Sequence, residues 1–382
     1  MSRRLTVLVI LGSLLLLSGS FVSVGGSDTP SECSVTLSPA QSVQVAIDDA
    51  RRGDVICLES GTWTESVEIP HSLTLRGVGK ERSTLKANTD AEGGVLPNVI
   101  VSGDAREVRV ISLENLALIG FDATTGLGIS LSGSSVGPTR LVATRLRLAD
   151  HFVGMIATGH DVRVTVRDST VENHRSDGIS GLGNVGDVEG PTIEIIRTTL
   201  RNNGTAIHAS GSTLVSVDGT SVRNNGSGIA VTGTGPPTPR EPRLHVSDSV
   251  IADNGRSGQA NSLTGGIVLG RNPNDLSFDV PVAAEIERSR ISGNQRGIVL
   301  GTATDLTLSG SAIQGNQGWG VAEFAQPCFP DLPESSGLNG IVRLSDGNVV
   351  RGNNESGNLD GRGNPGVHPF RHLADGQVCL PR

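Results

Sequence analysis

The chain has 382 residues, the length of about two to three ordinary domains. Hydrophobic residues make up 36% of it and 51 residues are glycine; this composition excludes a disordered polymer, and the lack of a strict Gly-X-Y period excludes collagen. The formal net charge is −8 and no basic stripe is present, so the sequence argues against a nucleic-acid partner.

The N-terminus has the pattern of a secretory signal peptide. Arg3 and Arg4 precede an apolar run over residues 5–17, and a segment rich in small residues follows, with Ser18, Gly19, Ser20, Ser23, Val24 and Gly25. The apolar run is short for a membrane-spanning helix. We therefore expect residues 1–26 to be removed and the mature protein to be exported to the extracellular space, the cell surface or the periplasm, with no stable membrane span. An uncleaved N-terminal anchor is the alternative.

Residues 27–77 predict an N-terminal cap and a first coil. Apolar residues at helical spacing predict a short capping helix whose buried face consists of Val43, Ala46, Ile47 and Ala50. Short alternating segments then predict three strands, over residues 55–58, 67–69 and 73–75.

A repeated sequence motif predicts the fold of residues 78–354. A small residue is followed by an aliphatic residue, an asparagine, and then a Gly- or Ala-aliphatic pair, and clear copies read TTLRNNGTAI (198–207), TSVRNNGSGI (220–229), SRISGNQRGI (289–298) and SAIQGNQGWGV (311–321). Each copy follows an alternating segment, so each repeat predicts three short strands. Such a unit cannot bury its apolar side alone, but stacked units bury it against each other. The sequence therefore predicts an all-β solenoid, a parallel β-helix.

The repeated asparagines predict a structural ladder. Asparagine tolerates left-handed backbone conformations, and its amide can bond to the backbone of the next coil. We expect this ladder to contain Asn203, Asn225, Asn254, Asn294 and Asn316, with Asn353 as a sixth member.

Four cysteines allow three disulfide pairings in an oxidising compartment. We favour the local pairs Cys33–Cys57 and Cys328–Cys379, because the ends of a stacked fold are where fraying must be stopped. No CxxC motif occurs and no histidine stands at a ligand spacing from a cysteine, so we expect no metal there. Residues 355–382 are rich in Gly, Asn and Pro and predict a C-terminal cap held by Cys379.

The segment 42–77 contains AIDDA, GDVICL, SGTW, ESVEI and SLTLRG in that order. It resembles the first coil of right-handed β-helix proteins of the pectin-lyase-like superfamily, and the repeats from about residue 108 resemble the generic repeats of that superfamily. The resemblance implies a right-handed, single-stranded parallel β-helix. It does not imply one activity, because lyases, hydrolases, esterases, epimerases, adhesins and a periplasmic copper-binding family share this fold.

Strand alternation places ionisable residues on one outward face. The strand before the asparagine turn directs Asp218, His245, Glu285 and Glu287 outward on neighbouring coils, about 5 Å apart. Crowded carboxylates can raise one pKa for general-acid work, so these four residues are the candidate catalytic residues. A solvated sheet face is the alternative interpretation.

Three further residues are candidates for substrate binding. Glu194 lies on the same outward face, with Arg167 predicted beside it, and Trp319 offers an aromatic ring for a sugar. Trp319 is equally suited to closing the C-terminal end together with Phe324 and Phe329. Long insertions that we expect along one edge of the solenoid, next to the acidic face, cover residues 181–191, 232–242, 269–281 and 322–340.

Three functions of different classes agree with these features. The first is an exported, non-catalytic β-helix that binds extracellular or cell-envelope polysaccharide, or another surface partner, through its loop-bearing edge. The second is a polysaccharide lyase or glycoside hydrolase that uses the acidic face. The third is a structural or assembly element. No cofactor is expected, except Ca²⁺ for a lyase, and the sequence leaves open whether the protein is an enzyme.

Overall fold

The computed structural model divides into two compact units, residues 1–32 and Cys33–Arg382. The residues that the structure describes are 32–90, 92–101, 107–121, 124–133, 137–183, 189–233, 240–255, 264–270, 281–301, 304–324, 328–329, 341–345, 347–355 and 377–380. The expected signal peptide, residues 1–26, lies outside these ranges, as does most of the expected C-terminal cap. Within these ranges, no helix has the length and apolar character needed to cross a membrane.

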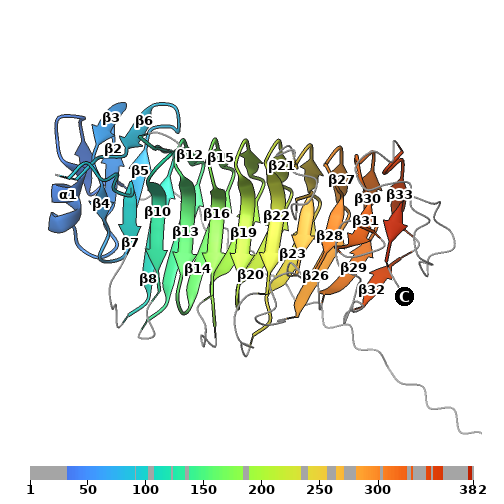
Figure 1. The fold of residues 1–382 in the computed structure, drawn as a ribbon. Helices are drawn as coiled ribbons and strands as arrows, with labels where there is room; N and C mark the ends of the chain where they lie inside the picture. Colours follow the sequence, from blue (N-terminus) through green and yellow to red (C-terminus); the bar gives the residue numbers. More distant parts are fainter. Residues whose placement is uncertain are drawn as a thin grey trace, which may run out of the picture. The chain divides into compact units, whose positions relative to one another are not determined.

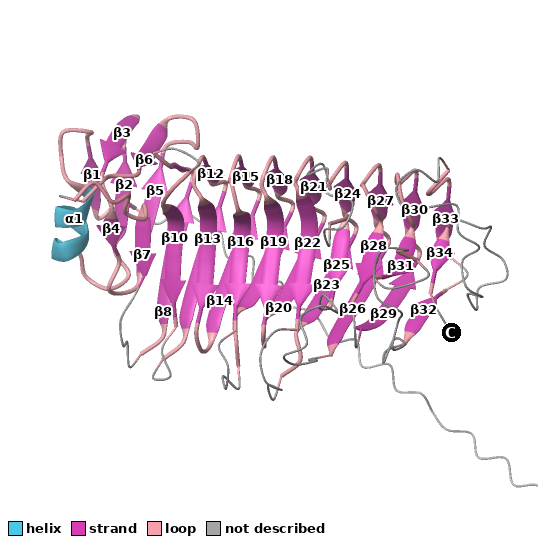
Figure 2. Ribbon diagram, viewed as in Figure 1, coloured by secondary structure: helices cyan, strands magenta, loops and turns pink. Residues whose placement is uncertain are grey.

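Three parallel sheets build the unit that begins at Cys33, and from β2 onward each turn of the chain adds one strand to each sheet (Figures 1 and 2). Sheet A contains β1 (Val35–Leu37), β2 (Val55–Leu58), β5 (Leu73–Gly77), β8 (Arg109–Glu114), β11 (Thr139–Thr144), β14 (Val162–Arg167), β17 (Thr192–Ile196), β20 (Leu214–Asp218), β23 (Arg243–Ser247), β26 (Val282–Glu287), β29 (Thr304–Ser309) and β32 (Val342–Leu344).

Sheet B contains β3 (Gly61–Thr64), β6 (Ser83–Lys86), β9 (Ala117–Ile119), β12 (Arg147–Ala149), β15 (Thr170–Glu172), β18 (Thr199–Arg201), β21 (Ser221–Arg223), β24 (Val250–Ala252), β27 (Arg290–Ser292), β30 (Ala312–Gln314) and β33 (Val349–Arg351). Sheet C contains β4 (Val67–Glu68), β7 (Val99–Val101), β10 (Leu127–Ser132), β13 (Val153–Thr158), β16 (Asp177–Leu182), β19 (Thr205–Ser210), β22 (Ser227–Thr232), β25 (Ile267–Leu269), β28 (Ile298–Leu300), β31 (Val321–Glu323) and β34 (Val378–Cys379). The predicted right-handed parallel β-helix is confirmed.

The core consists of aliphatic side chains stacked from coil to coil. In sheet C the register aligns Ile179 with Ile207, Ile229, Ile267, Ile298 and Val321, and all of these side chains are fully buried. Burying one such side chain stabilises the fold by about 1.5–3 kcal/mol. A slip of one residue would turn the aliphatic row outward, so this row fixes the register of the whole stack.

A short helix, α1 (Val43–Asp49), lies at the N-terminal end of the stack (Figure 2). Ser42 is its N-cap and accepts a hydrogen bond from the Val45 N–H, which satisfies one donor of the first turn. Val43 and Ile47 are fully buried against the core, as predicted. The helix therefore covers the apolar interior of the first coil.

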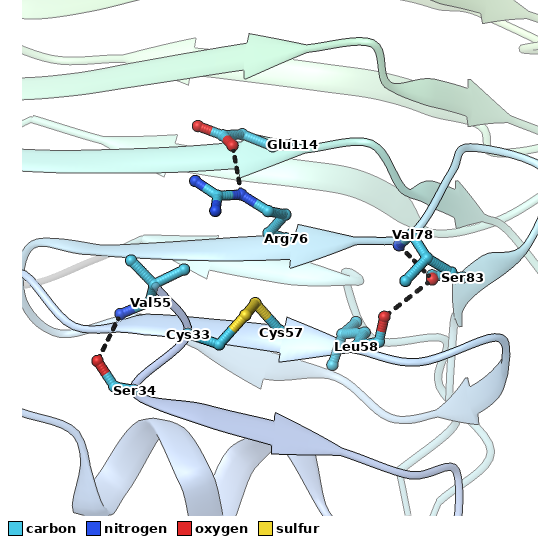
Figure 3. Close-up of a disulfide and its surroundings, with 9 residues drawn as sticks. All are labelled: Cys33, Ser34, Val55, Cys57, Leu58, Arg76, Val78, Ser83 and Glu114. Atoms are coloured by element: carbon cyan, nitrogen blue, oxygen red, sulfur yellow. Dashed lines mark hydrogen bonds and ion pairs between the residues drawn. A yellow bond between two sulfur atoms is a disulfide. The ribbon is translucent and has the colours of Figure 1, made fainter. Parts of the chain in front are cut away.

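Two disulfides join Cys33 to Cys57 and Cys328 to Cys379, which confirms the local pairing. Figure 3 shows the first, which connects the residue before Ser34 to strand β2. Nearby, the Ser34 hydroxyl accepts a hydrogen bond from the Val55 N–H at 3.1 Å. Each disulfide lies near one end of the stack and ties a terminal strand to the coil beside it.

A buried ladder of amides runs through the turns between sheets B and C. From Asn225 onward, the Oδ1 atom of each asparagine accepts hydrogen bonds from the backbone N–H and the Nδ2 group of the asparagine one coil earlier, at 2.7–3.1 Å. Each Nδ2 also donates to a sheet B carbonyl, such as that of Leu200 for Asn225. The ladder contains Asn203, Asn225, Asn254, Asn294, Asn316 and Asn353, and Gln377 accepts the last pair of hydrogen bonds.

Two histidines continue this ladder toward the N-terminus. His174 replaces an asparagine closely: its Nδ1 accepts from the His151 N–H at 3.2 Å, and its Nε2–H donates to the Leu148 carbonyl at 3.2 Å. His151 lies one coil earlier and its Nε2 bonds to the Asn98 side chain. Gly154 makes room for the His174 ring, because a Cβ atom there would approach its Nε2 to 2.6 Å.

A second ladder, of hydroxyls, follows the turns between sheets A and B. The backbone N–H of each small polar residue donates to the hydroxyl of its counterpart on the next coil, at 3.0–3.4 Å. Its members are Ser169, Thr198, Thr220, Ser249, Ser289 and Ser311. The small residue that begins each sequence repeat therefore has a hydrogen-bonding role that the pattern did not predict.

Candidate functional site

A groove with a volume of about 530 Å³ crosses the outward face of sheet A. Six strands contribute to it, from β17 to β32, and the alternation of each strand presents its polar residues to the groove while its aliphatic residues enter the core. The residues that line it are Thr192, Glu194, Leu214, Val215, Ser216, Arg243, Leu244, His245, Ala283, Ala284, Glu285, Asp305, Thr307 and Arg343.

One row of aligned side chains forms the middle of the groove. The register pairs Glu194 with Ser216, Ser216 with His245, His245 with Glu285, Glu285 with Thr307, and Thr307 with Arg343. His245 Nδ1 lies 3.7 Å from a Glu285 carboxylate oxygen, with both side chains about half exposed, at 42% and 56%. The row therefore offers a donor or acceptor on each of six successive coils, about 4.8 Å apart.

Glu287 lies beside this pair but does not line the groove. Ligand atoms of His245, Glu285 and Glu287 lie within 4.8 Å of one another, the one such grouping found among the residues the structure describes. The hydrogen bond from Arg288 lowers the pKa of Glu287 and keeps this carboxylate charged. Arg288 also forms a two-fold hydrogen bond with Asp248. Glu287 is therefore part of an exposed ion-pair network next to the groove.

Asp218 is also separated from the groove. The register aligns Asp218 with Ser247 and not with His245, and the Ser247 hydroxyl donates to its Oδ1 at 2.7 Å. Of the four candidate catalytic residues, the structure thus brings His245 and Glu285 together inside the groove and places Asp218 and Glu287 in the next row.

The prediction that Arg167 lies beside Glu194 is wrong. Arg167 aligns with Ile196, which lies two positions after Glu194 on β17. Its Nε donates to the Thr144 hydroxyl at 2.9 Å. Glu194 does line the groove and accepts a hydrogen bond from the Thr165 hydroxyl at 3.2 Å. Among the described lining residues, the arginines are Arg243 and Arg343, which the sequence pattern did not indicate.

The assignment of Trp319 to substrate binding is also wrong, because this side chain is only 1% exposed. Its Nε1–H donates to the Cys328 carbonyl at 3.0 Å. Trp319, Phe324 and Phe329 pack with the second disulfide against outward residues of β25, β28 and β31, in a cluster separate from the main core. They neither present a ring to a ligand nor close the end of the core; they cover the apolar outer face of sheet C.

The four long insertions that we expected beside the acidic face lie mostly outside the described residues. Arg240, near the end of the second insertion, donates to the backbone carbonyls of Gly190, Pro191 and Ser212. It joins the segments that precede β17, β20 and β23, which are strands of the groove.

The comparisons with known proteins agree with this architecture. The sequence matches the family model described as right handed beta helix region over residues 127–324, just over half of the chain. No curated protein matches it. Among solved structures, the A-module of the mannuronan C-5 epimerase AlgE6 from Azotobacter vinelandii is 16% identical with a TM-score of 0.45, over 80% of this chain and 93% of that chain.

Two further solved structures have a comparably low sequence identity. The periplasmic alginate epimerase AlgG is 15% identical with a TM-score of 0.48, over 76% of this chain and 73% of that chain. The pectate lyase Pel9A is 12% identical with a TM-score of 0.37, over 92% of this chain and 88% of that chain. The coil architecture and the family match together identify this chain as a member of the right-handed β-helix family.

Proposed function

We propose that the protein is exported and binds a polysaccharide in the groove of sheet A. The observation that carries the proposal is the polar row from Glu194 to Arg343, which repeats hydrogen-bonding side chains along six coils of one groove. A repeating row matches a ligand that itself repeats, and hydroxyl-rich sugars offer partners for both carboxylates and guanidinium groups.

The chemistry of the lining argues against other ligand classes. Among the residues that the structure describes, no Phe or Trp side chain lines the groove, and its aliphatic members lie between charged or hydroxyl-bearing neighbours. Ligand sites for apolar small molecules are predominantly hydrophobic and aromatic, unlike this groove. Carboxylates of Glu194, Glu285 and Asp305 would repel a nucleic-acid backbone.

Export is supported by the two disulfides. Disulfides persist in oxidising compartments and are rare in the cytosol. The charged and apolar pattern of residues 3–17 agrees with the same route. We therefore place the proposed binding function outside the cell or in the periplasm.

The test is binding of neutral and acidic glycans by isothermal titration calorimetry. We expect His245→Ala combined with Glu285→Ala to weaken glycan binding at least tenfold, because two hydrogen-bonding groups in the centre of the row are lost, each contributing about 1 kcal/mol. Glu59→Ala, an exposed carboxylate on an N-terminal coil, is the control and should bind normally. A glycan panel without binding, or equal binding by both variants, would contradict the proposal.

Catalysis in the same groove is the second candidate, and the His245–Glu285 pair favours it. A histidine held near a carboxylate can act as a general base, with the carboxylate orienting the ring. Turnover of a bound glycan that disappears in His245→Ala while binding survives would establish a lyase or hydrolase. Binding without turnover would leave a binding protein.

A further inference from the structure

A second hollow lies on the outward side of sheet B, away from the groove strands. It has a volume of about 750 Å³ and extends over the strands from β21 to β33 and the turns that follow them. Arginines and residues with small side chains predominate in its lining, which consists of Arg223, Val250, Ala252, Asp253, Arg290, Ser292, Gly293, Gln314, Gly315, Arg351, Gly352 and Glu355. Three arginines thus face two carboxylates.

The hollow exists because one row of side chains ends there. From β12 onward the residue that follows each sheet B strand has a positive φ, and up to β24 it is Asp or Asn; for example, Asn202 donates to Asn173 at 3.2 Å. After β27, β30 and β33 the same position is occupied by Gly293, Gly315 and Gly352, with φ of 66°, 63° and 64°. A Cβ atom at Gly315 would have no neighbour within 4 Å. Glycine therefore removes the row of side chains over the last three of these turns.

The three arginines have no carboxylate partner among the residues that the structure describes. Arginines on earlier coils are paired: Arg147 and Arg201 both bond to Glu172. In the hollow, the Nε of Arg223 donates to the Ser221 hydroxyl at 2.7 Å, and that of Arg290 donates to the Ser292 hydroxyl at 3.1 Å. These bonds restrain the guanidinium groups while their terminal amino groups keep their hydrogen-bonding capacity.

The spacing of the arginines excludes convergence on one small anion. They lie on β21, β27 and β33, which are alternate strands of sheet B. Successive arginines are therefore about 10 Å apart along the stack, and the outer two about 20 Å apart. Guanidinium groups bind carboxylates through paired hydrogen bonds. Arg223 and Arg351 share one register row, whereas Arg290 lies two positions earlier on its strand. Three such groups spread along the hollow fit a chain whose anionic groups repeat over a similar distance, as acidic sugars two units apart do in an extended glycan.

From this geometry we infer that sheet B carries a second binding site, for a linear anionic polysaccharide, with one acidic group held on every second coil. None of the described residues that line the hollow is aromatic, so this part of the site lacks the stacking platforms that single-stranded nucleic acids use. The site is independent of the groove of sheet A, because its residues come from other strands.

The test measures binding of polygalacturonate, with dextran sulfate as the sulfated counterpart, in the His245→Ala/Glu285→Ala protein, so that the groove of sheet A is already impaired. Adding Arg290→Ala should weaken binding about tenfold, the effect of losing one charge-assisted hydrogen bond of about 1.5 kcal/mol. Arg82→Ala, which removes an equal charge at an exposed site on an N-terminal coil, is the control and should leave binding unchanged. Affinity should fall with added salt.

A second variant fills the hollow without removing charge. Gly315→Asn places a side chain where φ is 63°, a conformation that asparagine adopts on the earlier coils, and should also weaken binding. Equal affinity of the Arg290→Ala and Arg82→Ala proteins would overturn the inference, as would equal binding of neutral dextran or single-stranded DNA. If inorganic sulfate saturates the protein with the same affinity as polygalacturonate, the hollow is a site for a single ion, and the inference is also overturned. If binding is lost when His245 and Glu285 are changed but not when Arg290 is changed, the proposal for the groove of sheet A stands and the second site is refuted.

Discussion

Acidification from pH 7 to pH 4 is expected to lower the free energy of unfolding by about 6 kcal/mol through His151 and His174 alone, and asparagine at position 174 should recover about half of this. Both rings are buried and stacked, with centroids 5.4 Å apart. Burial, assisted by repulsion from His174, lowers the pKa of His151 from 6.5 to about 3. Burial also lowers the pKa of His174 to about 4, although the hydrogen bond from its Nε2–H to the Leu148 carbonyl and the nearby Glu172 carboxylate favour its charged form.

The direction of this change in stability follows from whether the folded or the unfolded chain binds the protons. Below pH 6.5 the unfolded chain takes up a proton on each histidine, while the folded protein does not until the pH approaches 4 or 3. The stability contribution is therefore complete above pH 6.5 and is lost as the pH falls toward the folded pKa values. In the structure, the neutral Nδ1 of His174 accepts the His151 N–H, so a proton on that atom would break the ladder.

The measurement is urea unfolding followed by circular dichroism at pH 7, 6, 5 and 4. The His174→Asn variant keeps an acceptor and a donor at this coil, as the other ladder members have. Between pH 6 and 4 its free energy of unfolding should fall by about 1.4 kcal/mol less per pH unit than that of the native protein. His245→Asn makes the same chemical change at a 42% exposed histidine of the groove and serves as the control for the substitution itself. Identical pH dependence in the native and His174→Asn proteins would refute this assignment.

Removing one ladder asparagine should have a similarly large effect. Asn225→Gly takes away the acceptor for the Asn203 N–H and side chain, and the donors to the Leu200 carbonyl and to Asn254. Each buried polar group left unpaired costs about 1–3 kcal/mol, so we expect a loss of about 4 kcal/mol in the free energy of unfolding.

The adjacent residue offers a matched control. Asn224 has a φ of 57°, which glycine adopts freely, so Asn224→Gly makes the same chemical change next to the ladder and should cost less than about 1 kcal/mol. Chemical denaturation of both variants at pH 7 measures the difference. Similar stability of the two proteins would mean that the amide ladder adds little to the strength of the stack.

The sequence predicted the fold well because its strongest signals are periodic. The aliphatic residues aligned with Ile179 recur once per coil, and a row of this kind has only one register that buries it. The amide ladder was visible for the same reason. His151 and His174 were missed, since a search for repeated asparagines does not show that an imidazole can supply the same acceptor and donor.

The candidate site was predicted only in part because alternation gives a side chain its face but not its neighbours. His245 and Glu285 were placed correctly on the outward face, and their direct pairing follows from register. Arg167 and Glu194 share that face, yet a shift of two positions separates them. Trp319 could not be placed from periodicity, because it packs outside the repeating core, against Phe324 and Phe329 of the last insertion.

The amide ladder has a consequence for how such a chain can change its length. Consecutive ladder partners are 22, 29, 40, 22 and 37 residues apart, from Asn203 to Asn353, yet every step makes the same two hydrogen bonds. A coil can thus accept extra residues without disturbing the coils beside it, provided that its asparagine returns to the same position in the ladder. Each coil boundary is a position for grafting a new segment, which makes this stack a scaffold in which recognition loops can be exchanged one at a time.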